Sequence, residues 1–99
     1  MSFVSITTWR MNIETETLEH VTGLMRSKYF PGLLGLGAMH STLIDIDLDR
    51  FAIVTTYPNR QVRDDALLHI TELRSKGAEE FGAELMDAYS GDVIASSDS

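Results

Sequence analysis

Three side chains that could bind and act on a flat organic molecule lie in or beside extended runs of this sequence. Trp9, His40 and Tyr57 belong to three separate segments rich in β-branched and aromatic residues. We expect one face of a sheet to hold all three. The tryptophan and tyrosine would then form walls for an aromatic compound, and the tyrosine or histidine could shuttle a proton. The alternative is that Trp9 and Tyr57 are packing residues and that His40 is a hydrogen-bonded interior histidine.

A further histidine, His69, stands beside the strongest helical pattern of the chain. Its apolar positions recur every three or four residues, which traces one face of a long helix. His69 is at the flank of this face, so it either turns toward a pocket near Tyr57 or points into water. We predict His69, Tyr57 and His40 as candidate catalytic residues, with histidine as the base, and Trp9, Tyr57 and His69 as candidate ligand-binding residues. The apolar positions of the helix are Val62, Ala66, Ile70, Leu73 and Gly77.

The composition argues against several classes of function. There is no cysteine and the three histidines lack a local zinc-binding spacing, so we expect neither a metal nor a cofactor. The net charge is −7 and the eight basic residues are scattered, which argues against nucleic acid as a partner. No run approaches the roughly 18 apolar residues of a membrane span, and the N-terminus lacks the pattern of a signal peptide. We therefore expect a cytoplasmic protein.

The first half of the chain predicts a strand, a helix and a second strand. Residues 3–10 (FVSITTWR) are β-branched and aromatic. Residues 12–30 carry glutamates near the start and basic residues near the end, as the helix dipole favours. Pro31 and Gly32 are expected to end this helix. The second strand is expected over residues 38–47, where isoleucines alternate with aspartates.

The second half predicts a hairpin, a helix and a last strand. A short polar turn leads into a strand over residues 51–57. Asn59 is the expected N-cap of a helix that persists to about residues 81–82. The last extended segment is expected to cover residues 84–89, to break at Ser90–Gly91 and to resume over residues 92–95.

This order of elements, β-α-β-β-α-β, is the ferredoxin-like arrangement of the α+β class. We predict a four-stranded antiparallel sheet with both helices on one face, because right-handed crossovers put them on the same side. Residues 1–95 would form one domain and residues 96–99 a polar, frayed tail. Large apolar side chains occur on both faces of the predicted strands, and two helices can cover only one face. A second copy of the chain is the simplest cover for the other, so we expect a homodimer.

Three segments of the sequence resemble a known superfamily. FPGLLG follows the first predicted helix, FAIVTTYPNRQ leads into the second, and EEFGAELMDAYSGDVIA stands near the end of the chain. Together with the order of elements, they resemble the dimeric α/β-barrel superfamily and, within it, the small antibiotic-biosynthesis-monooxygenase-like proteins. The resemblance covers nearly the whole chain. It implies that the sheets of two subunits pack face to face into a barrel.

Haem-degrading members of this superfamily provide a comparison at individual positions. In them, an aromatic residue at the end of the third strand and a histidine on the second helix line the pocket. Tyr57 matches the aromatic position as tyrosine rather than tryptophan, and His69 lies on the second predicted helix. The asparagine that these relatives carry on the first strand has no counterpart, since Asn12 lies past the end of that strand. This departure argues against haem.

Two classes of function remain. The resemblance implies a cofactor-independent oxygenase acting on a small aromatic or polyketide-like compound, by proton abstraction from a phenol or enol and direct reaction with oxygen in a dry pocket. The alternative is a non-catalytic dimer that binds a small apolar ligand or supports a partner protein. The enzyme needs at least one histidine inside an enclosed cavity, whereas the alternative tolerates all three histidines in solvent. The pocket would lie beneath the helices or in the lumen between subunits.

Overall fold

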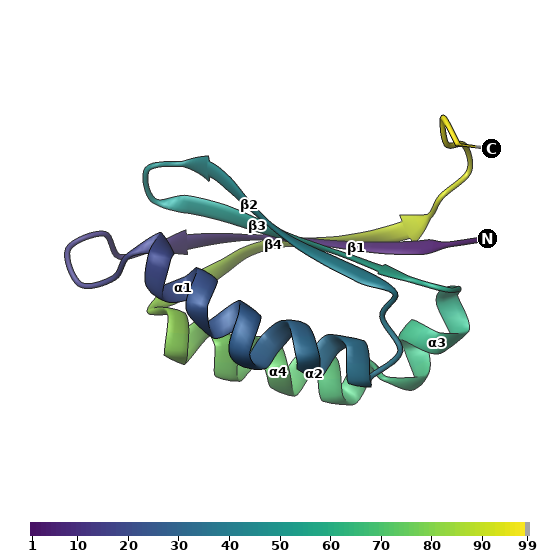
Figure 1. Cartoon of the computed structure of the whole chain (residues 1–99), viewed down its shortest axis with the longest axis horizontal. Helices are drawn as coiled ribbons and strands as arrows, with labels where there is room; N and C mark the ends of the chain where they lie inside the picture. Colours follow the sequence, from purple (N-terminus) through teal and green to yellow (C-terminus); the bar gives the residue numbers. More distant parts are fainter. Residues whose placement is uncertain (99) are drawn as a thin grey trace.

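The structure, a computed structural model, describes residues 1–98 as a four-stranded antiparallel sheet with helices packed on one face (Figure 1). The order across the sheet is β2-β3-β1-β4. The predicted ferredoxin-like arrangement is confirmed. Residue 99 of the predicted tail lies outside the described residues. The strands are β1 (Phe3–Met11), β2 (His40–Asp47), β3 (Arg50–Tyr57) and β4 (Ala83–Asp92).

The first helical segment starts and ends later than predicted. Residues 12–17 lie outside the helix, and Thr17 caps α1 (Leu18–Leu24) by accepting a hydrogen bond from a backbone N–H of the first turn. The helical path continues through a π-helix, η1 (Met25–Tyr29), into α2 (Phe30–Gly35).

The prediction that Pro31 and Gly32 end this helix is wrong. In η1 the Phe30 N–H bonds to the carbonyl of Met25, five residues earlier. Pro31 then stands in the first turn of α2, where its missing N–H is not needed. The helical path ends before Gly37, whose φ of 104° is open to glycine but strained for other residues.

The second helical segment follows the prediction, with one break. The Asn59 side chain caps α3 (Arg60–Asp65) by accepting a hydrogen bond of 2.9 Å from a backbone N–H of the first turn. Ala66, with φ −96° and ψ 0°, separates α3 from α4 (Leu67–Phe81). Gly82 ends α4 in the left-handed conformation, with φ 59°.

The last strand is continuous, so the predicted break at Ser90–Gly91 is wrong. Both residues are paired with β1. The irregularity falls instead between Thr8 and Trp9 of β1, where the register shifts and Met86 becomes the extra residue of β4. A bulge in the middle of the strand therefore replaces the predicted break.

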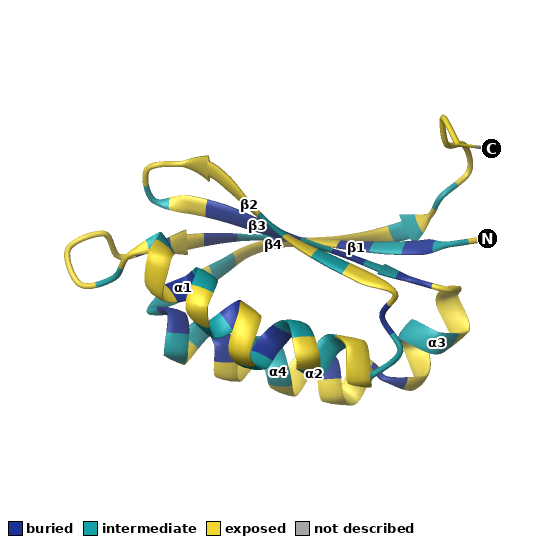
Figure 2. Cartoon of the chain, viewed as in Figure 1, coloured by how far each residue is buried: buried dark blue, intermediate teal, exposed yellow. Residues whose placement is uncertain are grey.

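The two faces of the sheet differ in what covers them. Along β1 the side chains alternate, so Phe3 and Trp9 face the helices and Ile6 faces the other way. The helices lie on one side of the sheet (Figure 2), and the buried Val21 of α1 and Ile70 of α4 belong to the same core clusters as Trp9 and Phe3, respectively. Among residues 1–98, no helix lies over the other face, and none is long and apolar enough to cross a membrane (Figure 1).

This open face is apolar near its centre. Ile6 of β1 lies opposite Val54 of β3 and Tyr89 of β4, and Ile44 of β2 points the same way. The exposed fraction is 38% for Ile6, 41% for Ile44 and 61% for Tyr89. A contiguous apolar patch of this kind is typical of an interaction surface.

Candidate functional site

The helix-side face of the sheet carries two apolar clusters with a band of hydroxyl groups between them. One cluster includes Trp9 and Phe51, and the other includes Phe3 and Tyr57. The alternation of side chains along β1 and β3 brings both clusters and the band to the same face. Small polar residues therefore interrupt the apolar core between the two clusters. The buried residues of the band are Ser5, Thr7 and Thr55.

A cavity of about 40 Å³ lies over this band, between the sheet and the helices. That volume holds only a few water molecules, whereas sites for drug-sized ligands have about 300 Å³ or more. A bound organic molecule would therefore have to push lining side chains aside. The lining comes from β1, β3, η1, α2 and α4, and includes Trp9, Met25, Tyr29, Leu33, Ile53, Tyr57, Ile70, Leu73, Arg74 and Phe81 in addition to the band.

Trp9 stands at one end of the cavity in a well-defined orientation. Its indole Nε1 donates a hydrogen bond of 2.8 Å to Thr7 Oγ1. The ring is parallel to Phe51, with centroids 6.1 Å apart, and meets Phe81 edge-on at 5.8 Å. These contacts make Trp9 a rigid aromatic wall.

Tyr57 and Arg74 stand at the other end. Arg74 Nη2 donates a hydrogen bond of 2.9 Å to Ser5 Oγ. Burial raises the pKa of Tyr57, while the charges of Arg74 and Arg63 act against that rise, so the phenol stays protonated at neutral pH. Burial also lowers the pKa of Arg74, but a guanidinium remains charged at neutral pH. This end of the cavity thus offers one cation and one phenolic donor.

The π-helix supplies two further lining residues, Met25 and Tyr29. The Tyr29 hydroxyl donates to Glu80 Oε1 at 2.5 Å. Burial and this hydrogen bond to a carboxylate raise the pKa of Tyr29 above its ordinary value. Single π turns inside helices occur frequently at functional sites. Here the π turn carries part of the cavity wall.

The structure does not bring His40 to Trp9 and Tyr57. His40 lies opposite Thr56 of β3, so its side chain is on the open face while Tyr57 faces the helices. It is exposed, and its Nε2 lies 3.0 Å from Thr42 Oγ1. The expectation of one shared face is wrong for His40, because a difference of one position in a strand moves a side chain to the opposite face.

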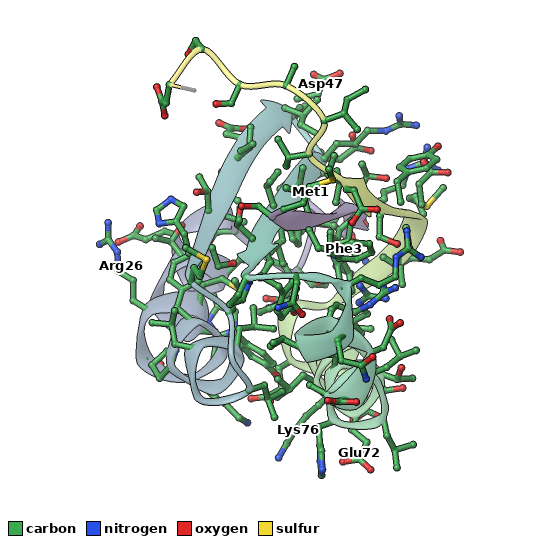
Figure 3. All side chains as sticks on the ribbon, turned by 90° about the vertical axis from the view of Figure 1, so that its right-hand side faces the viewer. Met1, Phe3, Arg26, Asp47, Glu72 and Lys76 are labelled. Atoms are coloured by element: carbon green, nitrogen blue, oxygen red, sulfur yellow. The ribbon has the colours of Figure 1, made fainter. Side chains whose placement is uncertain are left out.

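His69 also lies away from the cavity, on the outer side of α4. Its side chain is 65% exposed, and Nδ1 is 3.8 Å from Glu72 Oε2. Glu72 and Lys76, which share a shallow surface depression with His69, point away from the sheet (Figure 3). His20, the remaining histidine, is exposed too. None of the three histidines of the chain lines the cavity.

Sequence reasoning brought Trp9 and Tyr57 to one cavity but missed its polar groups. Two signals could have found them. Ser5 and Thr7 interrupt the otherwise apolar alternation of the first strand. Arg74 follows Ile70 by four residues, so it lies next to the apolar face of its helix. A polar residue within an apolar pattern is a signal for a lined cavity.

The groups available in the cavity restrict its chemistry. They are hydroxyls, one guanidinium and aromatic rings, and these suit the binding of an organic molecule with a polar substituent. Within residues 1–98, no group of three or more His, Cys, Asp or Glu side chains is arranged to hold a metal ion.

Comparison with solved structures identifies the fold. The chain is similar to a dimeric ferredoxin-like protein from an uncultured marine organism, with TM-score 0.69, 12% identity, and coverage of 96% of this chain and 97% of that one. It is also similar to HapK from Hahella chejuensis, with TM-score 0.71, 10% identity and coverage of 97% and 95%. MupZ from Pseudomonas fluorescens gives TM-score 0.67, 13% identity and coverage of 90% and 69%. No protein-family model and no curated protein matches the sequence. The chain is thus similar to these proteins in its ferredoxin-like fold.

Proposed function

We propose that the protein binds a small aromatic compound in the cavity between the sheet and the helices. The supporting observation is that one cavity has the Trp9 ring at one end and the polar groups of Tyr57 and Arg74 at the other. Ligand sites are typically apolar clefts with a few placed polar groups. A flat ring would lie toward Trp9, and its polar substituent would point toward Tyr57.

We further propose that the binding unit is a homodimer, formed through the open face of the sheet. Support comes from the apolar residues of this face, among them Ile6, Ile44 and Tyr89. Two of the similar solved structures are described as dimeric ferredoxin-like proteins. In such a dimer the cavities would lie on the outer sides of the joined sheets, one under the helices of each subunit.

Direct oxygenation of the bound compound is a second candidate function. It is favoured by the position of Arg74 beside an apolar cavity, where a guanidinium would stabilise the enolate or phenolate that reacts with oxygen. A methylene group would consume one O₂ and give a carbonyl and one water, with no other reductant needed. The exposed positions of His20, His40 and His69 provide no base in the cavity. Binding is therefore the first candidate and oxygenation the second.

Fluorescence of Trp9, the one tryptophan of the chain, tests the proposed binding. We expect phenol, benzoate or benzamide to change its emission in a saturable manner, because a ring in the cavity would contact the indole. Tyr57→Phe keeps the aromatic wall and removes the hydroxyl. It should weaken binding of at least one of these probes about fivefold, the value of one neutral hydrogen bond.

The control is N-acetyltryptophanamide, which reports collisional quenching without a site. Linear quenching equal to that of this compound, with all three probes, would contradict binding at this cavity. For the second candidate, oxygen consumption is followed with an electrode in the presence of any compound that binds. Binding without oxygen uptake would leave ligand binding as the function.

A further inference from the structure

The free polar groups at the Tyr57 end of the cavity can all donate a hydrogen bond. A guanidinium has five N–H groups and accepts nothing, and one of those of Arg74 is used by Ser5 Oγ. The Tyr57 side chain is 1% exposed, and its hydroxyl makes no hydrogen bond to another group within residues 1–98. No side-chain polar atom of the described residues is both sealed and unpartnered, so this hydroxyl borders open space. The site is built to receive an acceptor.

Arg74 also lacks a counter-ion. Within residues 1–98, no carboxylate oxygen comes within 4.0 Å of its guanidinium. The two other arginines near this end are paired: Arg60 with Asp92 at 3.5 Å, and Arg63 with Asp64 at 2.9 Å. Removing a cation from water without a partner is unfavourable. In a chain of net charge −7, an arginine left without a carboxylate at a cavity points to an anion from outside.

Arg60 and Arg63 stand at the same end of the cavity, each paired with its own carboxylate. Their guanidinium carbons lie 4.9 Å and 4.6 Å from the centroid of the Phe3 ring. Phe3 is two residues before Ser5 on β1 and is on the same face of the sheet. Phe3 in turn lies opposite Tyr57. Three of the eight basic residues of the chain thus gather around one end of the cavity. Because Asp92 and Asp64 balance Arg60 and Arg63, the uncompensated positive charge at this end is that of Arg74, and it attracts an anion.

We propose that the ligand of this cavity is a small aromatic carboxylate. Its carboxylate pairs with the Arg74 guanidinium and accepts a hydrogen bond from Tyr57, and its ring extends toward Trp9. The inference rests on the proposed function and names the class of ligand. A carboxylate fits better than a phenolate because its two oxygens match the planar fork of a guanidinium. A phosphate carries more charge than the one unpaired cation would balance.

The small cavity limits the size of the ligand. At about 40 Å³ it must widen for even one six-membered ring. Met25 is among the lining side chains, and methionine adapts its shape to a ligand at low cost. A one-ring acid is therefore the expected size.

The test compares benzoate with benzamide, which has nearly the same shape but no charge. Both are titrated against the full chain in Tris buffer without phosphate, with Trp9 emission as the readout and calorimetry as a second measurement. We expect benzoate to bind at least tenfold more tightly than benzamide. Arg74→Met should remove that preference by weakening benzoate at least tenfold, while benzamide changes less than twofold.

Two further variants separate the guanidinium from charge in general. Arg74→Lys keeps a positive charge but loses the fork, so it should restore only part of the benzoate affinity. Arg26→Met removes an exposed arginine that points away from the cavity, and should leave both affinities unchanged (Figure 3). Circular dichroism and the melting temperature check that each variant is folded.

The outcomes distinguish this inference from the proposed function. Equal affinity for benzoate and benzamide in the wild type, with saturable Trp9 signals, would overturn the carboxylate inference and leave aromatic binding intact. An equal loss of benzoate affinity in Arg74→Met and Arg26→Met would overturn it too, since the effect would then be one of net charge. No saturable signal with either probe would overturn both proposals.

Discussion

At the scale of single residues, Glu80 joins two helical segments through one oxygen atom. Its Oε1 accepts hydrogen bonds from Lys28 Nζ and Tyr29 Oη, both at 2.5 Å. These bonds lower the pKa of Glu80, with Lys28 the larger cause. The carboxylate belongs to α4 and its two donors to η1. Glu80 thereby holds the Tyr29 ring against the cavity and against Phe81, 4.9 Å away.

We predict that Glu80→Gln lowers stability in a pH-dependent manner. The folded-state pKa of Glu80 lies below its ordinary value of 4.5, so its contribution to stability is complete above that value. The contribution is lost as the pH falls through the lower, folded-state pKa. Melting temperatures should therefore differ most between wild type and variant near neutral pH, and the difference should shrink below about pH 4.

Glu79→Gln is the matched control, since Glu79 is the exposed neighbour of Glu80 on the same helix. It should change the melting temperature little at any pH. A difference between wild type and Glu80→Gln that stays constant from neutral to acid pH would contradict the assigned role of the charge.

Individual positions were predictable where the period of a strand was clear. Phe3, Trp9 and Tyr57 follow the period of two that brings them to one face. The prediction for His40 was wrong because this residue is the first of β2. Which face its side chain takes depends on the pairing register of β2 with β3, and the sequence alone does not give that register. The prediction for His69 was wrong because it is at the flank of a helix. A rotation of the helix about its axis by a few tens of degrees decides whether such a residue faces the sheet or the solvent. Arg74 was missed because most arginines on helices are solvated.

At the scale of elements, substitution of two glycines by alanine should have opposite effects on stability. Gly82 ends α4 with φ 59°, and a Cβ there would stand 2.4 Å from Glu16 Cγ. Gly23 lies within α1, and a Cβ there would meet no atom within 4 Å. We predict that Gly82→Ala destabilises the protein by roughly 1–2 kcal/mol, the cost of a left-handed conformation. Gly23→Ala should stabilise it by about 0.5–1 kcal/mol.

Urea unfolding of both variants measures these differences in the free energy of unfolding. The two substitutions add the same methyl group, so each serves as the control for the other. A gain of stability in Gly82→Ala would mean that the left-handed cap is not retained in solution.

The order and type of the elements were predictable because their patterns are long and distinct. Asn59 capped its helix as expected, and the long periodic run became α3 and α4. The prediction for Pro31 was wrong because proline breaks a helix in its interior but is tolerated in a first turn. The π turn before Pro31 places it in the first turn of α2. The break predicted at Ser90–Gly91 was wrong because pairing with β1 overrides the weak strand propensity of these two residues.

At the scale of the whole molecule, the open face of the sheet predicts self-association. We expect the wild type to have twice the 11.0 kDa mass of one chain in light scattering at micromolar concentration. A stable interface of standard size buries about 1,600 Å² in total. Ile6→Asp places a charge at its centre and should give monomers, or insoluble protein.

Leu68→Asp is the control for this prediction, because Leu68 is a highly exposed apolar residue of α4, away from the open face. It should remain dimeric. A wild type of 11.0 kDa, or an Ile6→Asp variant with the mass of the wild type, would show that another surface or none is used.

The presence of apolar side chains on both faces of the sheet was predictable, because successive side chains of a strand point to opposite faces. Phe51 and Ile53 turned toward the helices, and Ala52 and Val54 toward the open face. The volume of the cavity was not predictable, since it depends on how far the helices stand from the hydroxyl band between the two apolar clusters. That distance follows from packing between α4 and the sheet.

The π turn also sets the rotational phase of the helical path on either side of it. Val21, Met25, Tyr29 and Leu33 are spaced by four residues, and successive four-residue steps drift by about 40° around a regular α-helix. The wider turn of η1 takes up part of that drift, so that Leu33 still reaches the cavity lined by Met25 and Tyr29. If residues 25–29 formed a regular α-helical turn instead, Leu33 would be turned further away from the side of the helix that carries Met25. The wider geometry of this turn therefore helps to keep Met25, Tyr29 and Leu33 in one continuous wall over the sheet.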